Sequence, residues 1–92
     1  MIDKKMVAKI IEHYGADIQS TVCMEECAEL IQAVSKEKRG KSDKHHLAEE
    51  IADVTICLEM LMQIYEIPDS SVNHWIDVKM KRTEQRMNNG GK

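Results

Sequence analysis

The sequence predicts an all-α fold, an antiparallel bundle of about four helices, and three observations support this. Of the 92 residues, 42% are hydrophobic, but there is no Phe, one Trp and two Tyr, so aliphatic residues and seven Met must fill the core. One Pro and four Gly leave long stretches without helix breakers. Apolar residues also recur at helical spacing in four segments. Because so small a chain buries little apolar surface, we expect oligomerisation to complete the bundle.

Two helices are predicted in the first half of the chain. Asp3 can cap a short helix over residues 4–14, and Gly15 can end it. Asp17 then opens a long helix over residues 18–38. This second helix has apolar residues on two sides, so we expect it to pack between two partners.

A short break and a third helix follow. In residues 39–44, Gly40 suits a C-terminal cap, and Ser42 or Asp43 can cap the next helix. That helix is predicted over residues 44–66. Because the connection is short, the second and third helices should be antiparallel neighbours.

A last helix is predicted to end at about Met87, with Asp69 or Ser70 as its cap after the turn at Pro68. Its expected core stripe is Val72, Ile76, Met80, Thr83 and Met87. Residues 88–92 are expected to be a frayed tail. With no internal repeat or linker, residues 1–92 should form a single domain.

Charge and cysteine content narrow the function classes. The net charge of −3 lacks the basic excess of proteins that bind nucleic acid polymers. There is no apolar run of 18 residues and no leader, so we expect a soluble cytoplasmic protein without a membrane partner. The odd number of cysteines, Cys23, Cys27 and Cys57, favours buried reduced thiols.

Two acidic clusters, on the second and third predicted helices, are the strongest functional signal. Helical projection at ~100° per residue turns four carboxylates toward apolar stripes. They are Glu26, Glu29, Glu50 and Asp53. Glu25 falls at the edge of its stripe, and Glu49 faces solvent. Carboxylates on an apolar face need a cationic partner, and all-oxygen ligation suits Mg²⁺, or alternatively Mn²⁺.

Other interpretations of these clusters are weaker but open. The acids could be solvated helix surface. A di-iron site needs Glu-x-x-His, which the sequence lacks, and the three cysteines project onto different stripes, which disfavours zinc. His45 and His46 follow the break and are expected to be solvated, although either could reach an anion when protonated.

The last predicted helix offers groups that could bind a nucleotide. Lys79, Arg82 and Arg86 share one stripe and could hold phosphate oxygens. Trp75 on the same stripe could stack on a base. The alternative is a solvated basic flank beside a core Trp.

The pattern Glu25-Glu26-Cys27-Ala28-Glu29, followed after twenty residues by Glu50-Ile51-Ala52-Asp53, resembles the EExxE…ExxD signature of the MazG-like all-α nucleoside triphosphate pyrophosphohydrolases. The similarity is greatest to short, single-domain bacterial and phage members. It implies a homodimer or homotetramer that binds Mg²⁺. It also implies hydrolysis of a nucleoside triphosphate between the α and β phosphates.

The resemblance also implies roles for individual residues. The family's metal ligands correspond to Glu26, Glu29, Glu50 and Asp53, and its basic residues to Lys79 and Arg82. Gln19, Asn73 and Trp75 are candidates for base recognition. Glu25, or one of the ligands such as Glu26, would orient the attacking water. The alternative functions are a non-catalytic helical module that binds nucleotide or protein, and a purely structural bundle.

Overall fold

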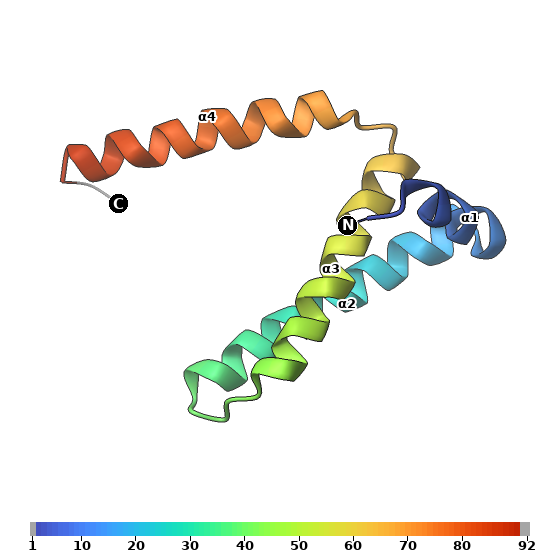
Figure 1. Cartoon of the computed structure of the whole chain (residues 1–92), viewed down its shortest axis with the longest axis horizontal. Helices are drawn as coiled ribbons and strands as arrows, with labels where there is room; N and C mark the ends of the chain where they lie inside the picture. Colours follow the sequence, from blue (N-terminus) through green and yellow to red (C-terminus); the bar gives the residue numbers. More distant parts are fainter. Residues whose placement is uncertain (1, 91–92) are drawn as a thin grey trace.

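The computed structural model describes residues 2–90, which form four helices and no strand (Figure 1). The helices are α1 (Lys4–Tyr14), α2 (Ala16–Lys38), α3 (Lys44–Ile64) and α4 (Asp69–Asn88). The all-α prediction is confirmed, and each helix lies within two residues of its predicted bounds. Within residues 2–90, no helix combines the length and the apolar composition needed to cross a lipid bilayer.

Two helices begin at the side-chain caps that the sequence predicts. Asp3 Oδ1 accepts a hydrogen bond of 3.0 Å from the Met6 amide at the start of α1. Asp43 Oδ1 accepts one of 3.0 Å from the His46 amide at the start of α3. Each carboxylate satisfies an amide that has no partner within its own helix.

Gly15 alone separates α1 from α2. Its φ of 95° is unfavourable for residues with a side chain, and its amide donates to the Ile11 carbonyl oxygen at 2.8 Å. The chain therefore ends one helix and starts the next at the same residue. Consequently α2 begins at Ala16, two residues before its predicted start, and Asp17 lies in its first turn.

The start of α4 differs from the prediction. Pro68 occupies the cap position, and no side chain caps this helix. The prediction of Asp69 or Ser70 as the cap is therefore wrong. Asp69 is instead the first helical residue, and its Oδ2 pairs with Lys4 Nζ at 2.6 Å, which joins the start of α4 to α1. Proline suits the entry of a helix because its ring fixes φ.

The two predicted ends in the second half of the chain shift by one or two residues. α3 ends at Ile64 rather than at residue 66, because Glu66 adopts a left-handed φ of 54° that a helix cannot include. α4 includes Asn88, which was expected in the tail. The last two residues of that predicted tail, 91 and 92, lie outside the described residues.

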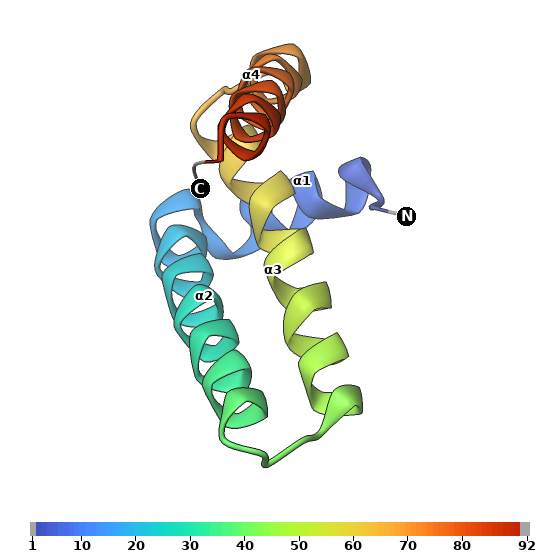
Figure 2. The ribbon, with the colours of Figure 1, turned by 90° about the vertical axis from the view of Figure 1, so that its left-hand side faces the viewer.

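Helices α2 and α3 form an antiparallel hairpin, and α1 packs across the end that is farther from the connecting turn (Figure 2). The buried core joins Val7 of α1, Cys23 of α2, and Cys57 and Met60 of α3. Aliphatic side chains of α1 and α3 pack around these four residues. This core joins α1 to one end of the hairpin. The rest of the α2–α3 interface, toward the connecting turn, lies outside the core.

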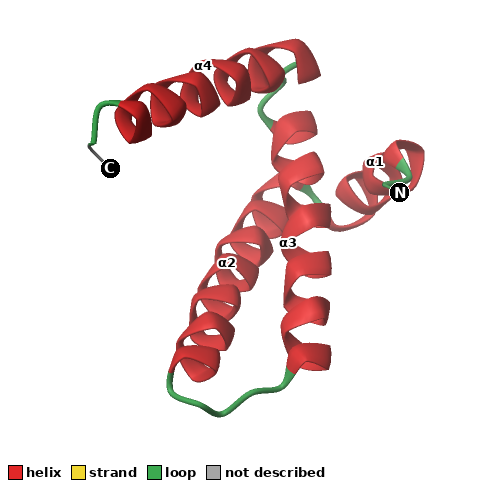
Figure 3. Cartoon of the chain, turned by 60° about the vertical axis from the view of Figure 1, so that its left-hand side comes forward, coloured by secondary structure: helices red, strands yellow, loops and turns green. Residues whose placement is uncertain are grey.

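Helix α4 leaves this three-helix unit and projects away from it (Figures 1 and 3). Its expected core stripe is therefore not a core within the chain: Val72 is half-buried, and the other members of the stripe are exposed, Met80 by 69%. The outer face of α2 is also uncovered, with Met24 73% exposed. The expected packing of α2 between two partners is thus satisfied on only one side.

Candidate metal centre

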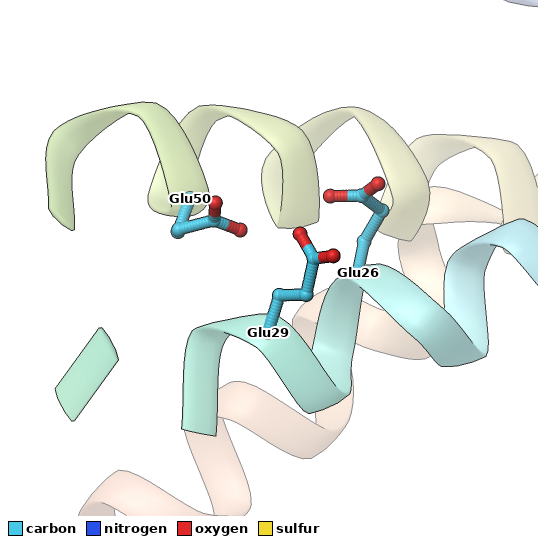
Figure 4. Close-up of side chains that lie close together, drawn as sticks. All are labelled: Glu26, Glu29 and Glu50. Atoms are coloured by element: carbon cyan, nitrogen blue, oxygen red, sulfur yellow. The ribbon is translucent and has the colours of Figure 1, made fainter. Parts of the chain in front are cut away.

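Three of the four predicted ligands converge between α2 and α3. One carboxylate oxygen each from Glu26, Glu29 and Glu50 lies within 4.8 Å of the other two (Figure 4). The spacing of three residues puts Glu26 and Glu29 on one face of α2. The antiparallel hairpin brings Glu50 of α3 opposite them. Separations of this size allow one small cation to contact several carboxylates at once.

Glu29 is exposed, but Glu26 and Glu50 of this cluster each have a buried oxygen, and such oxygens favour a positive partner. Glu50 is only 6% exposed. Oε2 of Glu50 and Oε2 of Glu26 are buried, and neither has a hydrogen-bond partner within residues 2–90. Burying a carboxylate oxygen without a partner is costly. A divalent cation would remove that cost, so the residues present fit a metal ion.

Asp53, the fourth predicted ligand, lies beside Glu26. Burial has the largest effect on Glu26 and raises the pKa of its carboxyl group above the usual 4.5; the charge of Asp53 and a hydrogen bond with it raise that pKa further. Glu29 and Glu50 add smaller repulsive contributions. This concentration of negative charge favours either a proton or a bound cation.

A hollow of about 220 Å³ adjoins the carboxylates on the side of the hairpin turn. Besides Glu29 and Glu50, it is lined by Gln32, Ala33 and Lys36 of α2 and by His46 of α3. Gln32 and Lys36 were not predicted as site residues, whereas His46 was expected to be solvated but able to reach an anion when protonated. Helical spacing could have found them, because Lys36 follows Glu29 by seven residues and His46 precedes Glu50 by four.

A family model of the MazG nucleotide pyrophosphohydrolase domain matches residues 18–89. The chain belongs to this family. The match spans all of α3 and α4 and nearly all of α2, and so includes every carboxylate of the candidate centre. The resemblance seen in the EExxE…ExxD pattern is therefore confirmed. No curated protein and no solved structure matches the chain.

Two acidic residues of this MazG domain lie outside the cluster, as projected. Glu49 is exposed, and its Oε1 lies 3.5 Å from His45 Nε2. Glu25 is also exposed, one position before Glu26 on α2. Glu49 therefore provides a matched control for Glu50, because the two are adjacent in sequence and differ in burial.

The predicted nucleotide-binding residues do not join the carboxylates of their own chain. Trp75, Lys79 and Arg82 are exposed on α4, which projects away from the hairpin (Figure 1). Trp75 and Lys79 line a separate, largely apolar hollow along that helix. Of the other base-recognition candidates, Asn73 is exposed on α4, whereas Gln19 is buried in α2.

Two of the three cysteines of the MazG domain, Cys23 and Cys57, form part of its core, whereas Cys27, also expected to be buried, is only partly so. Cys23 Sγ donates to the Cys57 carbonyl oxygen at 3.7 Å, and both residues are buried. Burial, with a hydrogen bond to Cys23, raises the pKa of the Cys57 thiol to about 12. A thiol with so high a pKa stays protonated at neutral pH and is a poor metal ligand.

Proposed function

We propose that this MazG domain is a Mg²⁺-dependent nucleotide pyrophosphohydrolase. It would cleave ribo- or deoxyribonucleoside triphosphates between the α and β phosphates, giving the monophosphate and pyrophosphate. The observation that supports this most strongly is the convergence of Glu26, Glu29 and Glu50 around buried oxygens that lack partners. Protein carboxylates usually supply only some of the ligands of a Mg²⁺ ion, and substrate phosphates supply others. An anionic cluster can therefore bind an anionic substrate through the metal.

In this proposal, Glu26, Glu29, Glu50 and Asp53 hold the Mg²⁺ ion, and Mn²⁺ could occupy the same oxygen ligands. When bound, the metal neutralises phosphate charge and activates water. Glu25, which is exposed and adjacent to Glu26 in sequence, or Glu26 itself orients the attacking water.

We infer that Lys79, Arg82 and Trp75 serve a carboxylate cluster in another copy of the chain. Their helix points away from its own hairpin, and its apolar residues are uncovered. A homodimer or homotetramer would cover those residues and place the basic side chains near a substrate. The free cysteines suit the reducing environment of the cytoplasm, where we place the reaction.

The proposal is tested by incubating the protein with Mg²⁺ and a panel of nucleoside triphosphates, and by measuring monophosphate and pyrophosphate separately. We expect both products in equal amounts and none when EDTA is present. Glu50→Gln should lower kcat by roughly 100-fold or more, since electrostatic groups at a reacting phosphate contribute on that order. Glu49→Gln should stay close to the wild-type rate.

Two results would overturn the proposal. One is a folded protein that hydrolyses no nucleotide with metal present; nucleotide binding without turnover would then support the non-catalytic module. The other is release of inorganic phosphate in place of pyrophosphate, which would mean that a different bond is cleaved.

A further inference from the structure

The hollow between the carboxylates and the hairpin turn has two chemically different ends. Glu29 and Glu50 bound it on the side of the metal centre. Lys36 of α2 and His46 of α3 bound it as well, one or two helical turns closer to the connection between the helices. A ligand in this hollow would therefore meet the cation site and basic side chains together.

The basic groups of the hollow are available to a ligand. Lys36 forms none of the ion pairs found within residues 2–90. His46 Nε2 lies 3.7 Å from Glu50 Oε1, beyond ordinary hydrogen-bond range, and its side chain is partly exposed. Gln32 also lines the hollow and adds an amide donor. Cationic and N–H donors beside a cation site favour an anion that binds both.

The size of the hollow restricts what that anion can be. At about 220 Å³ it is smaller than the ~300–1,000 Å³ typical of sites that enclose a whole organic ligand. The hollow is also partly open to solvent, so phosphate groups can lie in it while the nucleoside extends outside. The α phosphate carries the nucleoside and therefore needs open space beyond it, whereas the β and γ phosphates end in free oxygens. The hollow thus suits the terminal phosphates.

The hairpin turn holds these basic residues in place. Glu37, next to Lys36, accepts hydrogen bonds from Lys44 Nζ at 2.6 Å and from the Asp43 amide at 2.7 Å. The Lys44 bond has the largest effect in holding the pKa of Glu37 below its usual value, so this carboxylate stays charged. Asp43 in turn caps the His46 amide. Both sides of the hollow are therefore fixed to one short turn.

We propose that Lys36 and His46 are substrate-binding residues that hold the pyrophosphate portion of a nucleoside triphosphate, its β and γ phosphates, at the hairpin end of the metal centre. This rests on the proposed pyrophosphohydrolase function. It assigns a direction to the substrate: the terminal phosphates lie toward the turn, and the nucleoside extends away from it. The leaving pyrophosphate would remain on Lys36 and His46 until it dissociates.

The test is calorimetric binding of inorganic pyrophosphate, and separately of a nucleoside monophosphate, to the Mg²⁺-loaded protein. Lys36→Met should raise the Kd for pyrophosphate roughly tenfold or more, because a charge-assisted hydrogen bond is lost. His46→Gln should raise it about fivefold. The Kd for the monophosphate should change less than about twofold in both. Lys36→Arg keeps the charge and should restore most of the pyrophosphate affinity.

Two matched controls are available on the same helices. Lys38→Met and His45→Gln change exposed residues of the same types that do not line the hollow. Both should bind pyrophosphate as the wild type does. Equal weakening in the controls would indicate only a general charge effect, and would overturn the proposal. Greater weakening of monophosphate than of pyrophosphate would also overturn it, since the hollow would then hold the α phosphate.

This outcome is distinguishable from failure of the proposed function. If the wild type hydrolyses no nucleotide but its pyrophosphate affinity depends on Lys36 and His46, the anion site stands and the enzymatic assignment fails. If the wild type hydrolyses nucleotides while both variants bind pyrophosphate normally, the enzymatic assignment stands and the anion site fails. Circular dichroism of each variant establishes that its helices are intact.

Discussion

Glu26 combines burial with the negative charge of its neighbours at a single side chain. Its carboxyl pKa is raised first by burial and then by Asp53, so the folded protein holds this proton to a higher pH than the unfolded chain does. The corresponding stability is fully present below the ordinary pKa of 4.5. It is lost as the pH rises through the raised pKa, because the unfolded chain releases the proton first.

We therefore predict that the metal-free protein becomes less stable as the pH rises from 4.5 toward neutrality. Glu26→Gln cannot ionise and should remove much of that loss, and it should also reduce the stabilisation that Mg²⁺ provides. Urea unfolding in EDTA, then with added Mg²⁺, measures both effects. Glu49→Gln is the exposed control and should follow the wild type. A Glu26→Gln protein that loses as much stability as the wild type would contradict the prediction.

At the scale of elements, the α2–α3 hairpin depends on its turn. The two helices carry the carboxylates, and the turn determines how their faces meet. Glu37 joins the end of α2 to the start of α3, while Asp43 caps α3 through the His46 amide. Local interactions in a turn of a few residues thus help to align two helices of more than twenty residues each.

The cap can be tested by Asp43→Ala. This change removes the side-chain acceptor for the His46 amide but keeps the backbone amide that donates to Glu37. Loss of such a cap costs about 1 kcal/mol in the free energy of unfolding. For a domain of this size that corresponds to a Tm lower by roughly 4–8 °C.

Thermal unfolding followed by circular dichroism measures the effect of the cap. Lys41→Ala is the control, since Lys41 lies in the same turn and its exposed side chain forms none of the ion pairs found within residues 2–90. Asp43→Ala and Lys41→Ala proteins with the same Tm would show that the cap does not stabilise α3.

At the scale of the whole molecule, the uncovered apolar surface requires an explanation. Trp75, Ile76 and Met80 are exposed on α4, and Met24 and Ile31 are exposed on α2. Contiguous apolar patches on a protein usually mark an interaction surface. The arrangement of α4 also leaves Lys79 and Arg82 remote from the carboxylates of their own chain. Assembly of two or more copies would resolve both features together.

We accordingly predict that the wild-type protein sediments as a homodimer or homotetramer, and that Ile76→Asp shifts it toward monomer. A charge placed within an apolar interface is costly to bury. Analytical ultracentrifugation at micromolar concentration gives the mass of each species. If α4 serves the site of another copy, turnover should fall together with assembly.

Asp77→Asn is the matched control for assembly. Asp77 is adjacent in sequence, and it pairs with Lys81 at 3.2 Å on exposed surface. This variant should assemble as the wild type does. A wild type that is monomeric at these concentrations would contradict the assembly prediction.

The fold and part of the site could be predicted from sequence because both depend on interactions between residues that are close in the chain. Helix spans follow from apolar periodicity and from the residues at helix ends, and they were predicted to within two residues. Helical projection correctly turned Glu26 and Glu50 inward and Glu49 outward, whereas Glu29, also projected inward, is exposed. The hollow around Lys36 and His46 was missed, because it exists only where the faces of two helices meet.

The sequence by itself determined four helices, an antiparallel hairpin and two carboxylate pairs facing one another, since backbone hydrogen bonds and helical spacing act over a few residues. Only the tertiary structure decided which carboxylates converge, how much space lies beside them and where α4 points. Those features depend on packing between segments distant in sequence. After Pro68 no local rule returns α4 to its own hairpin, and the structure places this basic helix away from the carboxylates of its own chain.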